Sequence, residues 1–339
     1  MPDSPFDVVG VGINSVDRIA VVPHFPQPSG PRSKLRLSRY RAMCGGQTAT
    51  ALAACARLGL RAKYVGAVGR DADGAMVSKE LAVAGVDVSS VVSRDAVNRF
   101  ALVLVDEGTG GRAVLWDFDE RLALSDDDLP TDALQAARLI HVDDVDVRAA
   151  IRAARIGRAR GVPVTSDIDQ VTGDTRELLD AVTVAIFAEH VPEQLAADVR
   201  RWSGDSANVG GPMTGRGPAA STSDAIRAAL LTLPRREDQA FVVTLGERGA
   251  LALDSDGFHH HPAFPVRAAD TTGAGDVFRA GFIYALLRGW PRDEQLRFGN
   301  AAAAVSCTRI GAMASVPTLA EVEAILARGG GTNAKWGRG

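Results

Sequence analysis

The chain contains the nonapeptide Asp270-Thr271-Thr272-Gly273-Ala274-Gly275-Asp276-Val277-Phe278, in which a polar, glycine-rich turn runs directly into an apolar helical pattern. Glycine adopts backbone conformations that are closed to other residues, so Gly273 and Gly275 allow several amide N–H groups to point into one concavity. A helix is predicted from about Gly275 to Arg288, and its unpaired N–H groups and positive dipole end face the same concavity. The stretch therefore predicts an anion site.

A carboxylate stands at the mouth of this predicted site. Asp276 would repel a bound phosphate, which is a poor arrangement if the turn only holds an anion. The arrangement is useful if Asp276 takes the proton from a hydroxyl that attacks phosphorus, while the amides receive the charge of the transferred group. For an isolated Gly-Asp pair, an acidic residue that the helix dipole stabilises is an equally good interpretation. The complete nonapeptide is far more specific than such a pair.

The nonapeptide resembles the signature D-T-x-G-A-G-D-x-F of the ribokinase-like (PfkB) sugar kinase family, with every fixed position filled. The resemblance implies that Asp276 is the catalytic base and that the backbone of Gly273, Ala274 and Gly275 is the anion hole. It implies ATP and Mg²⁺ as cofactors. It also implies a ribokinase-like α/β fold, with a small β-sheet lid that keeps water away from the sugar.

Composition narrows the class of protein. The chain has 339 residues, a hydrophobic fraction of 46% and a formal net charge of -3. This length can bury a large core, no apolar run is long enough to span a membrane, and the charge argues against a nucleic-acid-binding surface. Cys44, Cys55 and Cys307 are scattered without metal-type spacing, which is typical of reduced thiols. We therefore expect a cytoplasmic protein with neither nucleic acid nor membrane as a partner.

An alternation of strand and helix patterns begins at about Leu139. Such alternation implies a doubly wound, mostly parallel sheet flanked by helices, with its ligand at the carboxyl ends of the strands. Four acids fall at predicted strand ends, and for each of them an ordinary surface position is the favoured interpretation: Asp143, Asp144, Asp167 and Asp169.

We expect a single ribokinase-like kinase domain over residues 1–328. Its β lid is built from about residues 18–43 and 98–120, where strand-like segments surround a glycine-rich hairpin signal. Residues 203–223 are rich in glycine, serine, proline and threonine, which predicts a mobile surface insertion. Residues 329–339 are expected to form a flexible tail.

A second motif indicates the acceptor side. Gly45-Gly46 opens a helix predicted over Ala51–Leu58, and the motif ends in Ala56-Arg57-Leu58-Gly59, which resembles the first signature of the same family. At Thr50 the motif departs from the family, because many members carry a sugar-binding asparagine at this position. A threonine hydroxyl can still form hydrogen bonds, but its reach is shorter than that of asparagine. The resemblance implies that five residues orient the acceptor: Asn14, Asp17, Gly45, Gly46 and Thr50.

The nucleotide side is indicated by Thr244-Leu245-Gly246-Glu247-Arg248-Gly249, which resembles the family's T-x-G-x-x-G loop. Its two glycines allow the backbone to approach ATP closely. The residues implied in ATP binding are Thr244, Gly246, Gly249, Thr272, Gly273, Gly275 and Asn300.

Two further segments concern metal ions. Ser306–Ser315 resembles a segment that binds a monovalent cation in many family members, and a K⁺ ion there would order the anion-hole loop. The residues implied in that site are Asp270, Thr272, Ser306, Gly311 and Ser315. Many members also carry an N-x-x-E pattern that tunes Mg²⁺ handling, and this pattern is altered in Ala188-Glu189-His190-Val191.

Among subfamilies the chain looks nearest to the ketohexokinase and sulfofructose kinase side. The resemblance thus implies transfer of the γ-phosphoryl group of ATP to a primary hydroxyl of a small, ketose-like sugar. Lid arginines and lysines could recognise an anionic sugar or could simply be solvated: Arg32, Lys34, Arg36 and Arg39. Family lids often pair, which makes a homodimer through the lid an expectation.

Two alternatives stay open. A nucleoside kinase of the same fold would need an aromatic pocket under the lid, which Phe25, Tyr40, Trp116 and Phe118 could supply. A catalytically weak, sugar-binding regulatory protein is favoured by the altered segment Ala188–Val191 and opposed by the intact Asp276.

Overall fold

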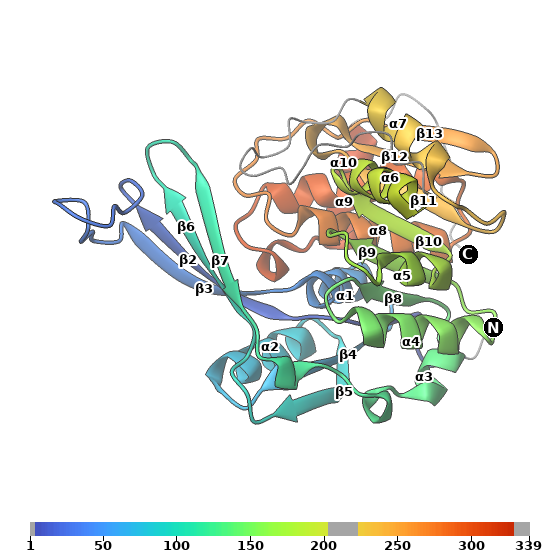
Figure 1. The fold of residues 1–339 in the computed structure, drawn as a ribbon, viewed down its shortest axis with the longest axis horizontal. Coiled ribbons are helices and arrows are strands. Elements are labelled where there is room, and N and C mark those ends of the chain that lie inside the picture. The colour runs from blue at the N-terminus through green and yellow to red at the C-terminus, as the bar shows by residue number, and fades with distance from the viewer. Residues whose placement is uncertain (1–3, 203–222, 329–339) are drawn as a thin grey trace.

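The computed structural model describes residues 4–202 and 223–328, and Figure 1 shows their arrangement. Among these residues the larger sheet has nine strands, in the order β13 (Gly257–His261), β12 (Ala250–Asp254), β11 (Ala240–Thr244), β10 (Val184–Ala188), β9 (Val164–Ile168), β8 (Ile140–Asp143), β1 (Val8–Val11), β4 (Ala62–Gly69) and β5 (Asp87–Arg94). Every neighbouring pair from β11 to β5 is parallel, whereas β12 and β13 join the edge as antiparallel strands. The predicted mostly parallel sheet is confirmed.

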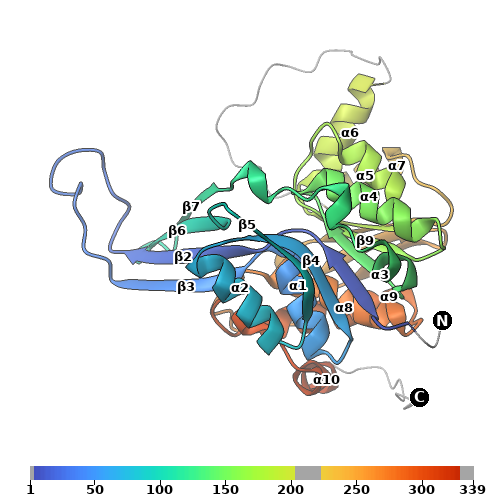
Figure 2. The ribbon, with the colours of Figure 1, turned by 90° about the horizontal axis from the view of Figure 1, so that it is seen from below.

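Helices cover both faces of this sheet (Figure 2). One face is covered by α3 (Thr131–Ala136), α4 (Val147–Arg158), α5 (Thr175–Ala181), α6 (Val191–Trp202) and α7 (Ser223–Thr232). The other face is covered by α1 (Gln47–Arg57), α2 (Ala72–Val83), α8 (Ala274–Leu287), α9 (Arg292–Cys307) and α10 (Leu319–Arg328). Because both faces are covered, the central strands are continuous apolar runs, and β1 is buried along its whole length.

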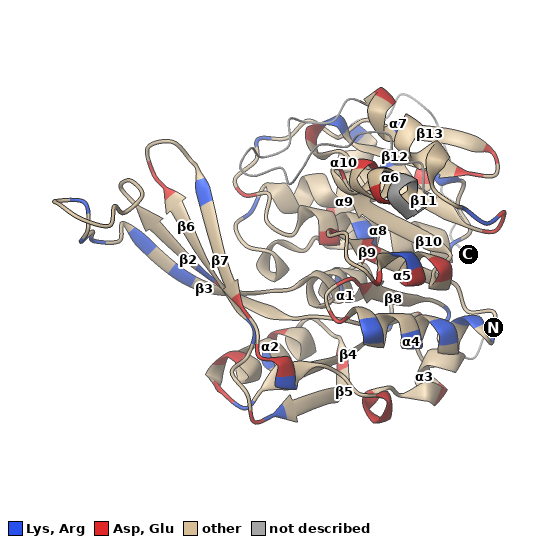
Figure 3. Cartoon of the chain, in the orientation of Figure 1, with Lys and Arg blue, Asp and Glu red and all other residues tan. Residues whose placement is uncertain are grey.

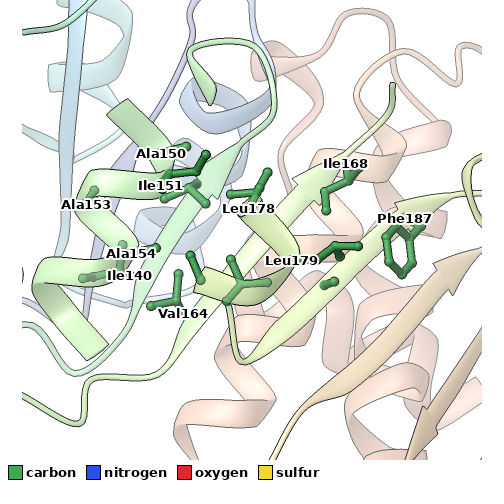
Figure 4. Packing of buried hydrophobic residues seen from close by; sticks show 14 of the residues in the cluster. Ile140, Ala150, Ile151, Ala153, Ala154, Val164, Ile168, Leu178, Leu179 and Phe187 are labelled. Atoms are coloured by element: carbon green, nitrogen blue, oxygen red, sulfur yellow. The ribbon is translucent and has the colours of Figure 1, made fainter. Parts of the chain in front are cut away.

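The packing of α4 and α5 onto β8 and β9 shows how one face is closed (Figure 4). Ile140 and Val164 are paired across the two strands, and both side chains are fully buried. A Cβ atom on Gly157 would lie 2.2 Å from Cδ1 of Ile140, so only glycine lets α4 approach the sheet this closely. Full burial of one such aliphatic side chain, for example Leu178, stabilises the fold by about 1.5–3 kcal/mol.

The direction in which the sheet grows changes at β1. After β1 the chain adds β4 and β5 on one side, and it then returns to add β8 to β11 on the other side. Helices that leave from the two sides diverge, and in open α/β sheets this opens a crevice outside the carboxyl ends of the two central strands. The fold therefore predicts a ligand site at the ends of β1 and β8.

A four-stranded sheet projects from the body of the protein at these strand ends (Figure 1). Its order is β3 (Arg39–Gly45), β2 (Ser15–Val22), β6 (Phe100–Asp106) and β7 (Arg112–Asp117). β6 and β7 fall within the predicted stretch 98–120, whereas β2 begins three residues before the predicted stretch 18–43 and β3 ends two residues after it. The expected second, smaller sheet is confirmed, and we refer to it as the lid.

Some expectations need revision. Helix α1 begins at Gln47 and not at Ala51, because Gly46 starts it with a φ of 96° and Thr48 is held by a tertiary hydrogen bond to Asp143. The expected insertion over 203–223 lies outside the described residues, apart from Ser223 at the start of α7, and so does the expected tail over 329–339. None of the helices described combines the length and the apolarity needed to cross a membrane.

Candidate active site

The nonapeptide forms the turn that starts α8. Gly273 occupies the N-cap position with a φ of 74°, in the left-handed region that favours glycine. A Cβ atom on Gly273 would lie 2.7 Å from Cβ of Ala312, so space as well as conformation requires glycine here. The Ala274 amide donates to the carbonyl oxygen of Thr271 within the turn. Among the described residues the amide of Gly275 has no backbone acceptor, so it stays available to an anion.

Asp276 lies in the first turn of α8, beside these amides. Burial raises the pKa of Asp276 to about 7. This value already includes the negative charges of Asp143 and Asp169, which raise the pKa, and the positive charge of Arg279 and a hydrogen bond to Asp167, which lower it. A carboxylate whose pKa is close to neutral can accept a proton from a hydroxyl and release it again. The electrostatics of Asp276 therefore suit a general base.

Arg279 is part of this site, although the sequence-based predictions did not include it. Its side chain is 4% exposed and forms an ion pair with the carboxylate of Asp167, which is 2% exposed. It also donates to the carbonyl oxygen of Ile186, at 3.5 Å. The signal for it was an arginine three residues after Asp276 in an otherwise apolar helix, where a charge needs a buried partner.

The acids at the strand ends correct another expectation. Asp143, Asp144 and Asp167 are buried, so an ordinary surface position is the wrong interpretation for these three, whereas Asp169 is exposed. Burial is tolerated because Asp143 and Asp144 accept hydrogen bonds and Asp167 forms the ion pair with Arg279. Asp144, for example, accepts hydrogen bonds from the backbone amides of Asp169 and Gln170, at 2.7 Å each.

Asp143 ties together the three segments that meet at the crevice. Its Oδ2 accepts hydrogen bonds from the Ile13 amide and from the Thr48 hydroxyl, both at 2.7 Å. A Cβ atom on Gly12 would lie 2.0 Å from the same oxygen, so glycine is required after β1. Asp143 thereby fixes the end of β1 and the start of α1 against the end of β8, and this fixes the floor of the site.

On the acceptor side, Asn14 is committed to protein contacts. Its Nδ2 donates to the Tyr64 hydroxyl at 3.0 Å and to the carbonyl oxygen of Ala67 at 2.8 Å. Its Oδ1 accepts from Asn98, at 3.2 Å. Asn14 thus holds the end of β1 against β4, and direct contact with an acceptor stays a prediction.

The other predicted acceptor residues lie close to one another. A Cβ atom on Gly45 would lie 2.8 Å from Oδ2 of Asp17, and one on Gly46 would lie 2.4 Å from Cα of Asn14. The Asp17 carboxylate accepts from the Ser15 hydroxyl, at 3.1 Å, and burial raises the pKa of Asp17.

Thr50 lies beside the turn at Gly273, where the anion hole is predicted. Its Oγ1 is buried and has no hydrogen-bond partner among the described residues. Its methyl group lies 3.4 Å from the position that a Cβ atom on Gly273 would take. An unsatisfied buried hydroxyl between two glycine turns is available to a polar group that neither turn provides.

A groove of about 710 Å³ lies on the other side of the anion hole, between α8, α9 and the turn after β11. The predicted ATP residues that line it are Thr244, Gly246, Gly249, Gly275 and Asn300. Thr272 lines a different cavity, under the lid. Asn300 also supports the wall of the groove, because its Nδ2 donates to the carbonyl oxygens of His261 and Pro262, at 2.8 Å and 3.2 Å. The groove, its glycines and the free amide at its end fit a nucleoside triphosphate.

The residues predicted for a K⁺ ion are only partly brought together. Asp270 accepts hydrogen bonds from the Thr272 hydroxyl at 2.7 Å and from the Gly311 amide at 3.0 Å. The hydroxyls of Ser306 and Ser315 instead donate to carbonyl oxygens of their own turns, those of Ala303 and Ala312. A monovalent cation at this position stays a prediction.

The altered segment Ala188–Val191 has a partner on the nucleotide side. Glu189 forms an ion pair with Arg248, at 2.6 Å, in the turn that carries Gly246 and Gly249. In the described part of the chain, no three acidic, histidine or cysteine side chains are arranged to hold a metal ion. The structure therefore assigns no cluster of protein ligands to Mg²⁺.

Comparisons with known proteins identify the family of the chain. Residues 6–319 match the model of the pfkB family carbohydrate kinases. The chain is 27% identical over 316 residues to the ribokinase of Haemophilus influenzae, covering 92% of this chain and 95% of the relative. It is 28% identical over 321 residues to the ATP-dependent ribose-1-phosphate kinase of Halopiger xanaduensis, covering 94% of this chain and 97% of the relative.

A solved structure shows the same fold. The crystal structure of a putative ribokinase from Agrobacterium tumefaciens superposes with a TM-score of 0.79 at 25% sequence identity, covering 95% of this chain and 98% of that chain. The match to the family model extends over most of the chain. The protein therefore belongs to the PfkB family of carbohydrate kinases.

Proposed function

We propose that the protein transfers the γ-phosphoryl group of ATP to a primary hydroxyl of a small sugar or sugar derivative, with a ketose-like acceptor favoured. The proposal rests on two neighbouring groups, the carboxylate of Asp276 and the free amide of Gly275. Burial raises the pKa of Asp276 to about 7. One group accepts a proton and the other accepts negative charge, and phosphoryl transfer to an alcohol requires both.

The reaction follows from this arrangement. The nucleotide lies in the groove between α8 and α9 with its phosphates at the start of α8. The acceptor hydroxyl attacks the γ-phosphorus and gives its proton to Asp276, while the bond between the γ-phosphorus and the bridging oxygen breaks and ADP leaves. The amides of Gly273 and Gly275 stabilise the charge on the transferred group. When bound, Mg²⁺ neutralises phosphate charge during this transfer.

The acceptor would lie between the two glycine turns. In this proposal Asp17 accepts hydrogen bonds from sugar hydroxyls, and the Thr50 hydroxyl, which is buried without a partner, contacts the sugar. Gly45 and Gly46 keep the wall of this space free of side chains. The relatives do not single out one acceptor, because one is named a ribokinase and another a ribose-1-phosphate kinase.

The lid would close the site. Arg112 of β7 donates to Asp270 at 3.0 Å and to the Thr272 hydroxyl at 3.2 Å, so the lid is attached directly to the turn that forms the anion hole. Closure of this kind keeps water from competing with the sugar hydroxyl. Pairing of two lids in a homodimer remains part of the proposal.

A nucleoside kinase is the second candidate. Trp116 is 64% exposed, and its ring stacks on Phe118 with 5.9 Å between the centroids. Through the pairs Asp17↔Ala101 and Ala101↔Trp116, Trp116 lies in the same row of the lid as Asp17. A large exposed ring in that row could stack on a base. The sugar-binding regulatory protein is the third reading, and it predicts binding without turnover.

The test is ADP formation with Mg²⁺ and K⁺ across ketoses, aldoses, sugar acids, sulfosugars and nucleosides. Acceptor-stimulated turnover that falls by about 10²–10⁴-fold in Asp276→Asn supports the kinase. Asp224→Asn is the matched control, because Asp224 is an exposed acid in the first turn of α7. If an acceptor shifts the melting temperature but no acceptor stimulates turnover, the regulatory reading replaces this proposal.

A further inference from the structure

One face of the lid is directed at the turn that forms the anion hole. Alternate residues of a strand share a face, and the pairs Ile19↔Arg41 and Val21↔Arg39 place two arginines of β3 on the face that carries Asp17. A cavity of about 130 Å³ lies between this face and residues 269–272. Its charged and hydroxyl-bearing side chains are Asp17, Arg39, Arg41, Arg112, Asp270 and Thr272.

The charges in this cavity do not cancel. Arg112 is paired with Asp270, which leaves Asp17 as the free acid. The guanidinium groups of Arg39 and Arg41 make no hydrogen bond or ion pair with any described residue. Figure 3 shows, in blue, basic residues in β3 and at one end of β7. Arg39 and Arg41 are exposed, so water solvates their guanidinium groups, and both groups stay available to pair directly with a bound anion.

The arginines continue a line of acceptor groups. Thr50 lies beside the anion hole, and Gly45 lies beside Asp17. Gly45, Arg41 and Arg39 are on the same face of β3, and residues two apart on a strand are about 6.5–7 Å apart. Along this face Arg41 and then Arg39 follow at increasing distance from Asp17, toward the outer end of the lid.

We propose that this cavity binds an anionic group of the acceptor, so that the substrate is a sugar carrying a phosphate or carboxylate at the end opposite the attacking hydroxyl. The inference rests on the proposed function and names the substrate class of that site. Arginine is suited to this role because its planar guanidinium makes paired hydrogen bonds to carboxylate and phosphate oxygens. Asp17 would repel the anion. This repulsion keeps the hydroxyl-bearing part of the sugar at Asp17 and its anionic end at the arginines.

The sequence had pointed to four basic lid residues, and the structure selects among them. Arg39 lines the cavity, whereas Arg32, Lys34 and Arg36 do not. Arg41, which is not one of those four residues, lines the cavity as well. The pattern Arg39-x-Arg41 with a period of two residues was the available signal, because it places both side chains on one face of a strand.

The experiment compares acceptors that differ in an anionic group: ribose with ribose 1-phosphate, fructose with fructose 1-phosphate, and glucose with gluconate. ADP formation gives kcat and KM for each. At least one anionic member is expected to exceed its neutral partner in kcat/KM by about tenfold or more, since a charge-assisted hydrogen bond is worth about that factor. Added salt should raise KM for the anionic member and leave that for the neutral one unchanged.

The variants Arg41→Gln and Arg39→Gln test the assignment to these side chains. Each is expected to raise KM for the anionic acceptor by about 10–100-fold and to leave KM for its neutral partner unchanged. Arg70→Gln is the matched control, because Arg70 is exposed and lies outside the cavity. Equal kcat/KM within every pair, or identical KM changes for both members of a pair, would overturn the inference while turnover still supports the kinase.

A second measurement separates the two proposals if no acceptor is phosphorylated. Titration calorimetry of the wild-type protein with fructose 1-phosphate and ribose 1-phosphate, repeated with Arg41→Gln, reports the anion site without turnover. If either sugar phosphate binds the wild-type protein and Arg41→Gln weakens that binding by about tenfold or more, the anion site is supported although the kinase proposal fails. Absence of such binding overturns the inference itself.

Discussion

The guanidinium of Arg279 lies against Gly275, one turn earlier in α8: a Cβ atom on Gly275 would be 2.7 Å from Nη1 of Arg279. Residues four apart on a helix are neighbours on its surface, so the same helix that starts with the anion hole carries a positive charge beside it. The ion pair with Asp167 holds that charge in place. Burial and the charges of Asp143 and Asp169 raise the pKa of Asp276, whereas the positive charge of Arg279 and a hydrogen bond to Asp167 lower it, the charge of Arg279 having the larger effect.

The first prediction concerns pH. Burial raises the pKa of Asp276 to about 7, and only the ionised form can accept the proton of the acceptor hydroxyl. We therefore expect kcat/KM to fall tenfold for each pH unit below about 7 and to level off above it. The measurement is kcat/KM against pH with saturating ATP. A profile that stays flat through neutral pH, or an identical acid limb in the residual activity of Asp276→Asn, would contradict the assignment.

Removing the charge of Arg279 should move that acid limb. Arg279 lowers the pKa of Asp276, so Arg279→Met should raise it and shift the acid limb toward higher pH. The groups that face Asp276 in the variant would be the carboxylates of Asp143, Asp167 and Asp169. Arg279→Lys keeps the charge and should return the limb toward its original position.

A purely structural role for Arg279 predicts a different result. Breaking a buried ion pair destabilises a protein by about 3–5 kcal/mol, because one charge is left without a partner. Chemical denaturation of both Arg279 variants measures this loss. If Arg279→Met loses stability while its pH profile stays where the wild-type profile is, Arg279 supports the fold and does not tune Asp276.

Gly273 should be essential for the anion hole. In Gly273→Ala the new methyl group would need a left-handed conformation at φ 74° and would lie 2.7 Å from Cβ of Ala312. The conformation alone costs about 1–2 kcal/mol. We expect the turn to shift and kcat to fall by at least about tenfold, since one misplaced charge-stabilising donor has at least that effect.

Gly289 provides the matched control at the opposite end of α8. It has a similar φ of 69°, but a Cβ atom there would meet nothing within 4 Å. Gly289→Ala should therefore lose about 1–2 kcal/mol of stability and keep its kcat. Equal kcat losses in Gly273→Ala and Gly289→Ala would mean that strain in α8, and not the shape of the anion hole, controls activity.

Thr50 and Thr48 form a natural pair for the last prediction. The Thr48 hydroxyl donates to Asp143 at 2.7 Å, whereas that of Thr50 is buried without a partner. Thr48→Val should lower the free energy of unfolding by about 1–3 kcal/mol, because it removes a donor from a buried carboxylate. Thr50→Val should leave stability equal or higher and should raise KM for the acceptor. A KM unchanged in Thr50→Val would exclude contact between its hydroxyl and the acceptor.

Much of this protein can be read from local sequence. The nonapeptide predicted the start of α8 and the place of Asp276, because glycine conformation and helix termination act within a few residues. Apolar runs alternating with helical patterns predicted the parallel sheet, since burial on both faces leaves a continuous signal in each strand. β5, which is only half-buried and carries serines among its valines, lacked that signal and was not predicted.

The arrangement of charges was decided by tertiary structure. Arg279 and Asp167 are far apart in sequence, and neither carries a local mark that names its partner. Acids that looked like surface residues, such as Asp143, are buried because distant donors reach them across the ends of β1 and β8. The sequence by itself determined most of the elements that form and the position of the glycine turn that starts α8. Only the packed fold decided which charges meet, because pairing in a low-dielectric interior depends on distances that no local pattern encodes.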